Sequence, residues 1–458
     1  MRRLLFGATG VVLLSMMGLG ACGGSDDSSA SADAGSDARK LFETGIPDTA
    51  YTPQTTRCVA APYPDGGVMS PVDSGSGPDA DDSDAGDDAG DTDAQPALGP
   101  PQLVSYGGRV LANPRVVPIT YANDDLADQI EDFVGSFGCT DYWRSVVSEY
   151  GVGQAEMLAP VRLTDPTPPT ISDSQIAAFL ESQIDAKTPG FADPPADVIF
   201  AFYFGSATSI ELFGEQSCRS FDGYHSSMRL PNGTKISYAV MARCGEDDID
   251  EVTGTSSHEF VEASTDPDPE AAPAYLQPDD DHIVFSFAAG GEAGDLCTFL
   301  PDADFQPAGY PFIVQRTWSN ASILAGGDPC VPPPTGAYVA GIPDQPDVIP
   351  VQNTINSSTT RGVAIAVGDT RTIDVHLVAQ DNASMGWTIE ALDTSRFSEG
   401  QARLNLSLDT SAATNGGIAH LTITRLGKGQ IYGAEPFTIH SHYSGRDAYW
   451  AGVVGDPQ

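Results

Sequence analysis

The sequence is poor in basic residues and lacks several common catalytic motifs. Of its 458 residues, 22 are Lys or Arg and 63 are Asp or Glu, which gives a formal net charge of -41. A chain this acidic repels nucleic-acid phosphates and anionic lipid headgroups, so neither is expected as a partner. It contains no G-x-S-x-G and no P-loop. A serine nucleophile and a nucleotide site therefore lack support.

The apolar run near the amino terminus, residues 4–17, is too short to span a bilayer comfortably. It follows Arg2 and Arg3 and precedes Leu19-Gly20-Ala21-Cys22, the layout of a signal peptide with a small-residue cleavage site. A plain signal peptide or a short membrane helix is the alternative, but the cysteine favours a bacterial lipobox. We therefore predict a lipoprotein signal in residues 1–22, with Cys22 acylated as the membrane anchor. Because Gly23 follows instead of Asp, the outer membrane is the expected location.

Cysteine is scarce, and no C-x-x-C occurs among the seven cysteines. This disfavours a redox motif and a zinc cluster held by thiolates. Without Cys22, six cysteines remain, and export to an oxidising compartment permits disulfides whose pairing the sequence leaves open. The six are Cys58, Cys139, Cys218, Cys244, Cys297 and Cys330.

Residues 23–101 are rich in Asp, Ala, Gly, Ser and Pro, and no Lys or Arg occurs between Arg57 and Arg109. Such a segment buries too little apolar surface to offset the entropy of ordering, and its like charges keep it extended. Its Asp-x-Asp repeats do not fit an EF-hand loop, which needs Gly at the sixth position and Glu at the twelfth. We predict a disordered acidic tether.

Residues 102–335 mix strand and helix patterns and predict an α/β or α+β domain. Residues 198–204 are a continuous apolar run, typical of a strand buried on both faces. The Ser172 cap with Gln175 three residues later marks a helix start. Further strands are expected at 115–121 and 236–241, and helices at 125–137, 142–150, 172–184 and 253–265.

Helical patterns disappear in residues 336–458, where short alternating strands predict an all-β, Ig-like sandwich. The Pro-rich stretches 329–334 and 343–350 are expected to form the hinge between the two domains. The clearest strand patterns lie at 372–378, 404–408, 419–423 and 437–439.

The segment from Ser257 to Pro267 carries the most specific chemistry. His258 and Glu262 lie four residues apart, hence on one helix face, with Glu259 beside them. This is the H-E-x-x-H geometry of zinc hydrolases with a carboxylate in place of the second histidine. It predicts His258 and Glu262 as zinc ligands and Glu259 as the base that takes a proton from water.

A third zinc ligand must come from elsewhere, because Pro267 ends the helix. Asp295 is the first candidate, since it lies in a Gly-rich turn that Cys297 could fix by a disulfide. His282, Glu292 and Asp266 are the alternatives, and Asp266 could instead cap the turn after the helix.

Three other histidines are weaker candidates. His225 could line the cleft or orient a carboxylate, and a structural role is equally compatible with the pattern. His440 and His442 share one strand face, which without a third ligand indicates a solvated surface.

Two motifs carry a family resemblance: Ser257-His258-Glu259-x-x-Glu262 through Asp266-Pro267, and Gly294-Asp295-Leu296-Cys297. Together they resemble the paired signature of the EXORDIUM, or phosphate-induced protein, family and its bacterial relatives. The resemblance spans about residues 105–330 and implies a zincin-type arrangement with His258 and Glu262 as ligands and Glu259 as base. Weaker agreement lies at Tyr106–Val110, Asn113–Val116, Tyr142-Trp143, Gly223–Ser226 and Tyr238–Cys244. The lipobox, the tether and the β-rich carboxyl-terminal region depart from the family pattern. The family's role in plant growth is therefore not expected of this chain.

The sequence therefore supports two alternative hypotheses about function. The first is a surface-anchored, zinc-dependent hydrolase that resembles metallopeptidases and acts on a protein or peptide substrate. The second is a non-enzymatic cell-surface or matrix protein with a degenerate zincin fold, whose β-sandwich binds a partner or a glycan. A third, a metal held for structure alone, would need four protein ligands.

Overall fold

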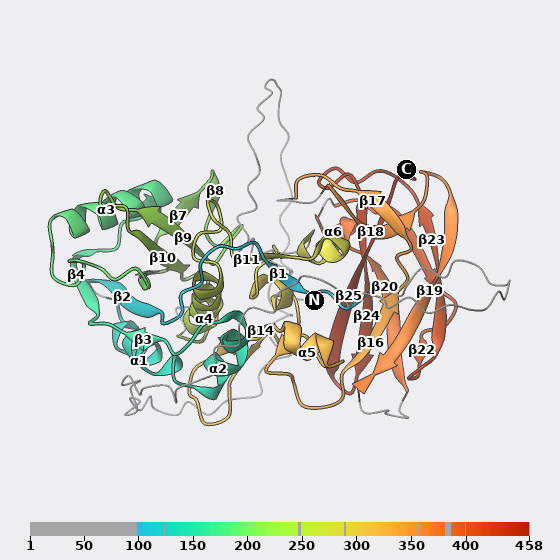
Figure 1. Ribbon diagram of the computed structural model, residues 1–458, viewed down its shortest axis with the longest axis horizontal. Helices are drawn as coiled ribbons and strands as arrows, with labels where there is room; N and C mark the ends of the chain where they lie inside the picture. The colour runs from blue at the N-terminus through green and yellow to red at the C-terminus, as the bar shows by residue number, and fades with distance from the viewer. Residues whose placement is uncertain are drawn as a thin grey trace, which may run out of the picture.

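The computed structural model describes residues 99–457, apart from positions 123, 246–248, 288–289, 355–357, 381–385 and 399. The predicted signal segment, with Cys22, and the predicted tether as far as residue 98 lie outside the described residues. The described chain is predominantly β-sheet with a few helices, arranged as two lobes side by side (Figure 1). None of the described helices combines the length and apolarity needed to cross a membrane.

The first lobe is built on a six-stranded sheet in the order β3-β2-β6-β10-β9, with β4 also paired to β2. Strands β2, β6 and β10 run parallel, whereas β9 is antiparallel to β10 and forms the edge. All seven residues of β6 are buried, as its unbroken apolar sequence predicts. The strands are β2 (Arg115–Ala122), β3 (Glu156–Met157), β4 (Val161–Pro166), β6 (Val198–Phe204), β9 (Gly223–Arg229) and β10 (Lys235–Ala242).

Helices cover both faces of this sheet. On one face, α1, α2 and α4 pack against alternate β6 residues such as Ile199 and Tyr203. On the other, α3 packs against Phe200 and Phe202. The predicted capping box is present, because Ser172 and Gln175 bond each other's backbone at the start of α3. The helices are α1 (Ala127–Phe137), α2 (Asp141–Val147) with the 3-10 turn η2 (Ser148–Tyr150), α3 (Asp173–Asp185) and α4 (Ile249–Thr265).

Small sheets flank this layer: β1 (Leu103–Ser105) pairs with β11 (Tyr275–Pro278), and β5 (Thr170–Ser172), β7 (Ser209–Leu212) and β8 (Glu215–Gln216) form a three-stranded sheet. The chain from β11 to β15 is mostly irregular and held by short pairings. Disulfides join Cys297 to Cys330 and Cys218 to Cys244. The remaining elements here are η3 (Asp280–Phe287), η4 (Asp295–Cys297), β12 (Asp304–Phe305), β13 (Val314–Gln315), β14 (Thr317–Trp318), α5 (Asn320–Leu324) and β15 (Cys330–Val331).

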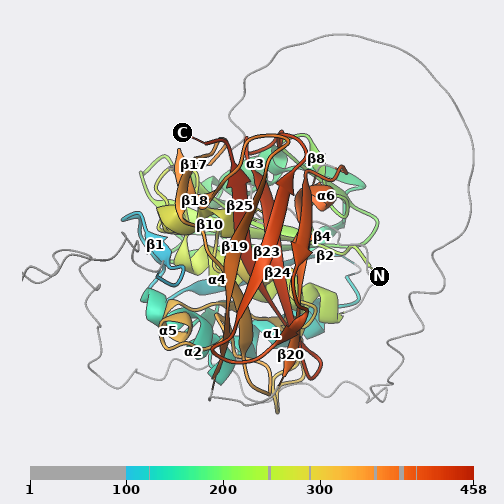
Figure 2. The same cartoon turned by 90° about the vertical axis from the view of Figure 1, so that its right-hand side faces the viewer.

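The second lobe consists of two sheets packed on a common apolar core (Figure 2). One has four strands in the order β16-β19-β23-β21, and the other six in the order β17-β18-β25-β24-β20-β22. The Pro-rich stretches predicted as a hinge contain β15 and β17, which pair with β14 and β18. The strands are β16 (Val339–Pro343), β17 (Asp347–Pro350), β18 (Thr359–Ala364), β19 (Thr370–Ala379), β20 (Trp387–Asp393), β21 (Leu404–Leu408), β22 (Ala412–Ala413), β23 (Ile418–Arg425), β24 (Glu435–Tyr443) and β25 (Arg446–Gly455), with the short helix α6 (Ser395–Ser398).

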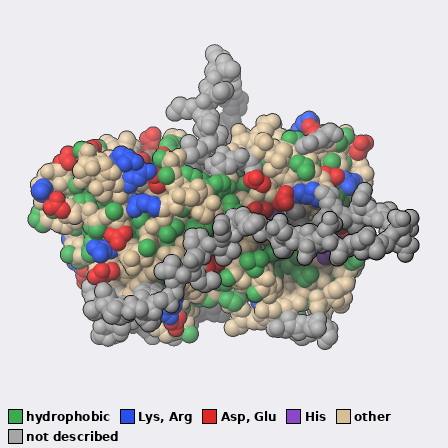
Figure 3. Space-filling model, in the orientation of Figure 1, with side chains coloured by type: hydrophobic (Ala, Val, Ile, Leu, Met, Phe, Trp, Pro, Cys, Tyr) green, Lys and Arg blue, Asp and Glu red, His purple; other side chains and the backbone are tan. Residues whose placement is uncertain are grey.

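A shared apolar core joins the two lobes. Phe285 of η3 meets Trp450 of β25 edge-on at 5.7 Å between ring centroids, and Phe287 stacks on Tyr432 at 3.8 Å. A buried ion pair between Asp328 and Arg446 adds to the same boundary. On the face shown in Figure 3, basic side chains are intermixed with acidic ones.

Candidate functional site

Helix α4 carries the site motif through the interior of the first lobe. It follows β10 directly and ends at Thr265, before Pro267, as the sequence predicts. His258 and Glu262 lie on one face of α4, with His258 Nε2 3.1 Å from Glu262 Oε2. Both side chains are buried, and a buried charge is costly unless it is paired or bound to a metal.

Asp295 reaches this helix face from η4, and its Oδ1 lies 3.7 Å from His258 Nε2. The close approach requires glycine at the preceding position. A Cβ at Gly294 would lie 2.7 Å from His258 Nδ1 and 2.8 Å from Glu262 Oε1. Gly294 therefore lets the backbone touch the helix, and Asp295 supplies a carboxylate at that point.

In each of these three side chains, one polar atom is held by a hydrogen bond. His258 Nδ1 lies 3.1 Å from Gln315 Oε1, so its N–H donates to the amide oxygen. Glu262 Oε1 accepts from the backbone N–H groups of Gly294 and Asp295 at 3.1 and 3.0 Å. Asp295 Oδ2 accepts a long bond of 3.4 Å from a backbone N–H of its own loop. These contacts fix the orientation of all three side chains.

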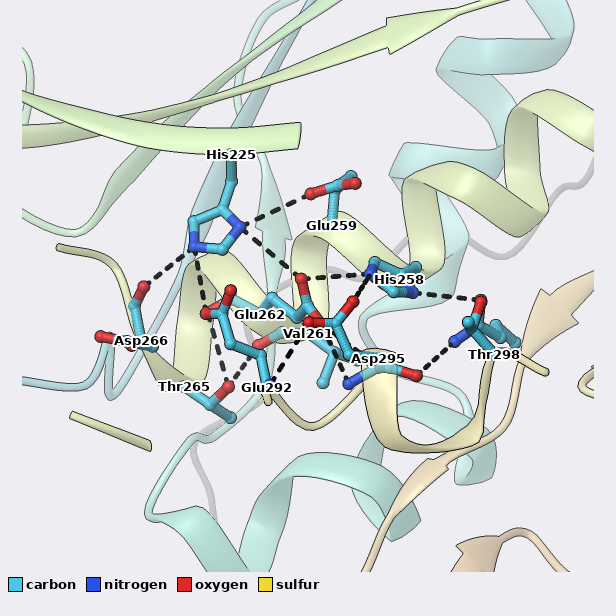
Figure 4. A network of polar contacts seen from close by, with 12 residues as sticks. His225, His258, Glu259, Val261, Glu262, Thr265, Asp266, Glu292, Asp295 and Thr298 are labelled. Atoms are coloured by element: carbon cyan, nitrogen blue, oxygen red, sulfur yellow. Dashed lines mark hydrogen bonds and ion pairs between the residues drawn. The ribbon is translucent and has the colours of Figure 1, made fainter. Parts of the chain in front are cut away.

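The second polar atom of each side chain is buried and has no hydrogen-bond partner among the described residues. These atoms are His258 Nε2, Glu262 Oε2 and Asp295 Oδ1, and they all lie within 4.8 Å of one another (Figure 4). One imidazole nitrogen and two carboxylate oxygens are a donor set that suits zinc. The residues present therefore fit a divalent cation.

A second group overlaps the first and includes the predicted base. Both Glu259 carboxylate oxygens lack a hydrogen-bond partner within the described chain. His225, on the edge strand β9, places Nδ1 3.5 Å from Glu259 Oε2 and 3.8 Å from Glu262 Oε2. His225 Nε2 lies 3.0 Å from the backbone oxygen of Asp266. Of the two functional roles weighed for His225, orienting a carboxylate agrees with these contacts.

The structure separates the candidates for a third ligand. Glu292 lies on the other side of the cluster, 3.5 Å from His225 Nε2. Asp266 accepts a backbone hydrogen bond across the loop after α4, which is the turn-capping role. His282 bonds Asp279 at 2.7 Å and belongs to neither group. Asp295 is the candidate that the fold brings to His258 and Glu262.

Burial and like charge raise the pKa values of several acidic groups around the site. Burial raises the pKa of Glu259, and burial with the Glu262 charge raises those of Glu292 and Asp295 well above the usual range. Burial alone lowers the pKa of His258, but the surrounding carboxylates, Glu262 above all, outweigh it and hold that pKa well above 6.5. Among the described residues, no Lys or Arg pairs with these carboxylates. The cluster must therefore gain positive charge from protons or from a bound cation.

Gln315 is a site residue that the sequence analysis missed. It lies on β13, 57 positions after His258, and also donates from Nε2 to the Gly294 oxygen at 2.9 Å. Its own N–H donates to Ser257 Oγ at 2.8 Å. One glutamine in a two-residue strand leaves no periodic signal, so no pattern in the sequence pointed to it.

The structure places an acidic residue beside the two carboxyl-terminal histidines, which the sequence did not predict. His440 and His442 share a strand face as predicted, but β25 brings Asp447 to them as a third potential ligand.

Neither a family model nor a curated protein matches this chain. Among solved structures, domains 4 and 5 of the S-layer protein SbsC are 16% identical over 26% of this chain and 54% of that structure, with a TM-score of 0.16. A PapD-like domain of human CEP192 is 13% identical over 29% of this chain and 92% of that domain, with a TM-score of 0.17. Likenesses this weak support no conclusion about function.

Proposed function

We propose that this chain is a surface-anchored lipoprotein whose first lobe is a zincin-like, zinc-dependent hydrolase acting on peptide bonds. One observation carries the proposal: the buried, unpartnered donor atoms of His258, Glu262 and Asp295 face one another. The motif resemblance to the EXORDIUM family supports the same roles. A helix bearing H-E-x-x-E beside a sheet with an antiparallel edge strand also favours a zincin-like lobe.

In this proposal, His258, Glu262 and Asp295 hold the zinc ion, which when bound acts as a Lewis acid towards a carbonyl group. Glu259 removes a proton from the attacking water as the water oxygen bonds to the carbonyl carbon. The same proton then passes to the leaving amine as the peptide bond breaks. The raised pKa of Glu259 makes it a stronger base than an exposed glutamate, and His225 at 3.5 Å orients its carboxylate.

A peptide-type substrate is supported by strand β9. It is the edge of the six-stranded sheet, and it carries His225 beside Glu259. An extended peptide can add to such an edge through backbone hydrogen bonds. The strand is buried at Gly223–His225 and partly exposed from Ser226 onward, so its second half is open to solvent.

Metal content of the full-length protein, purified without chelators, tests the site. We expect one tightly bound zinc at α4 that is lost in His258→Ala. Glu259→Gln should keep this zinc and abolish hydrolysis of a quenched fluorescent peptide library. Wild-type protein whose zinc content does not differ from that of His258→Ala would end the proposal.

A second function is favoured by how deeply the donors lie. The relative exposure of His258 is 3%, and Glu262 and Asp295 are both 0% exposed. Donors this enclosed restrict access by a substrate, which favours a non-enzymatic surface protein with a degenerate zincin fold whose β-rich lobe binds a partner or a glycan. The Glu259→Gln variant separates the two: equal and negligible peptidase activity in wild type and variant, with zinc retained in both, favours the binding protein.

The anchor is a separate part of the proposal and rests on the sequence around Cys22. We expect mass spectrometry to find an acylated Cys22 at the mature amino terminus and fractionation to place the protein in the outer membrane. Cys22→Ala should release it from the membrane fraction. Membrane retention of that variant without acylation would contradict the lipid anchor.

A further inference from the structure

A second cluster of potential ligands lies on the six-stranded sheet of the other lobe. His440 and His442 alternate along β24 with the buried Ser441, so their side chains share one face. Strand register brings two acidic residues beside them: Glu390 of β20 lies opposite His440, and Asp447 of β25 lies opposite His442. Three neighbouring strands thus present two imidazoles and two carboxylates on one surface.

Three donor atoms of this cluster converge on one point. Asp447 Oδ1 lies 2.6 Å from His440 Nε2 and 2.7 Å from His442 Nδ1. All three atoms lie within 4.8 Å of one another. Because each belongs to a paired strand instead of a loop, the backbone fixes their arrangement.

Glu390 is placed as an outer carboxylate, that is, one that accepts a hydrogen bond from a metal-binding histidine without binding the metal itself. Its Oε1 lies 2.8 Å from His440 Nδ1, so that N–H donates to Glu390, and Nε2 is the ring nitrogen that faces Asp447. Metal-bound histidines regularly donate their second ring nitrogen to a carboxylate in this way. Tyr449 stacks on the His440 ring, with centroids 4.6 Å apart, and further restricts its orientation.

A divalent metal ion placed between these three donor atoms would bind all of them together. The side chains of His440 and Asp447 are 17% and 18% exposed and that of His442 is 49% exposed, so an ion can enter from solvent.

We propose that His440, His442 and Asp447 form a second metal site, for a divalent transition metal such as zinc, with Glu390 as its outer carboxylate. Imidazole nitrogens with one carboxylate oxygen are a ligand set for zinc, copper or nickel, not for calcium or magnesium. The site shares no residue with the cluster on α4. It stands whether or not the first lobe is a hydrolase.

The chain offers matched controls. His420 and His376 are also half-exposed strand histidines, and each pairs with one aspartate at 2.9 Å, Asp374 and Asp344 respectively. Neither belongs to a three-ligand group among the described residues. If a lone His–Asp pair were enough to bind the ion, replacing these residues would have the same effect as replacing His442.

The test is a zinc titration of full-length, tag-free protein that has been stripped with a chelator and dialysed, followed by calorimetry and elemental analysis. Wild type should bind two equivalents of zinc. His442→Ala and Asp447→Asn should each lose one equivalent, while His420→Ala and His376→Ala lose none. Glu390→Gln should keep both equivalents of zinc. It should weaken zinc binding at the site of His440, His442 and Asp447 about 10-fold to 100-fold.

His258→Ala, measured in parallel, separates this site from the buried one. One equivalent in wild type that disappears in His442→Ala but not in His258→Ala supports the sheet site and ends the buried-site proposal. One equivalent that disappears only in His258→Ala overturns the sheet site, and so does loss of an equivalent in the His420→Ala control. Thermal unfolding of each stripped variant checks that these surface changes leave the fold intact.

Discussion

At the scale of single residues, the two polar atoms of each side chain in the buried cluster of His258, Glu262 and Asp295 have different roles. One atom is held by an amide or a backbone N–H, and the other faces the shared point without a hydrogen-bond partner among the described residues. The holding contacts decide whether the free atoms converge. Residues that touch no ion are therefore expected to control metal affinity.

Gln315→Ala tests this directly. It removes the acceptor of His258 Nδ1–H, so the ring is no longer fixed, and zinc affinity should fall about 10-fold to 100-fold while the stoichiometry is kept. Gln345→Ala is the control, because Gln345 is equally buried and bonds the backbone of β25. An equal loss of zinc affinity in both variants, measured by competition with a chelating dye, would contradict the positioning role.

Gly294→Ala should be more damaging. The added Cβ would lie 2.7 Å from His258 Nδ1 and 2.8 Å from Glu262 Oε1, so either the ligands or the η4 backbone must move. We expect loss of the α4 zinc by elemental analysis. Gly205→Ala is the control, since its Cβ would meet only Thr167 Oγ1 at an ordinary 3.9 Å. Retention of this zinc in Gly294→Ala would show that the approach of η4 is not needed.

The raised pKa values give stability a definite pH dependence in the zinc-free protein. Burial raises the pKa of Asp266 from 3.8 to about 6, and it raises those of Glu292 and Asp295 further. In each case the folded state binds protons more tightly than the unfolded state, so stability falls as pH rises from about 4 through 6 and beyond. His258, whose pKa is also raised, adds to the same trend.

Zinc should reverse this trend, because it binds only the deprotonated ligands. The zinc-induced increase in melting temperature is therefore expected to grow from pH 5 to pH 8, and binding should release protons. Calorimetry in buffers of different ionisation enthalpy measures that release. A zinc effect that is the same at both pH values would contradict the proposed ligand set.

At the scale of elements, predictions from sequence succeeded where a local pattern decides the structure. Strand β6 is buried throughout because its seven residues are all apolar, and the Ser172 capping box starts α3 where it was expected. The spacing of His258 and Glu262 within one helix placed both side chains together for the same local reason. By contrast, η4 and β13 are two or three residues long, and tertiary contacts and the Cys297–Cys330 disulfide set their positions. Asp295 could therefore be named only among alternatives, and Gln315 not at all.

Two disulfides that lie wholly within the described residues allow the role of η4 to be separated from general stability. Their sequence separations are 33 residues for Cys297–Cys330 and 26 for Cys218–Cys244, so loop-closure entropy predicts a similar cost of about 3–4 kcal/mol for removing either. Replacing both cysteines of a pair by alanine tests this without leaving a free thiol. Only removal of Cys297–Cys330 should weaken zinc binding at α4, because only this bond fixes the segment that carries Asp295. Equal effects on zinc affinity would mean that η4 is held by its other contacts.

At the scale of the whole molecule, the two lobes pack against each other through a shared core. Residues of η3 and of β25 belong to one apolar core, and Asp328 and Arg446 pair across the boundary. The same η3 segment leads into the loop that carries Glu292 and Asp295. The β-rich lobe therefore supports the part of the first lobe on which the site depends.

This packing predicts that the lobes unfold together. Differential scanning calorimetry of the zinc-free protein should show one cooperative transition, since separating the lobes would expose Phe285 and Trp450 to water. Trp450→Ala should cost about 3–5 kcal/mol and split the transition into two, because it removes the contact that couples the lobes. Trp387→Ala is the matched control: Trp387 is as buried as Trp450 but lies in the core between the two sheets, so this variant should lower the stability of the second lobe without uncoupling the first. Two transitions in the wild-type protein would show that each lobe folds alone and that the shared core contributes little to the site.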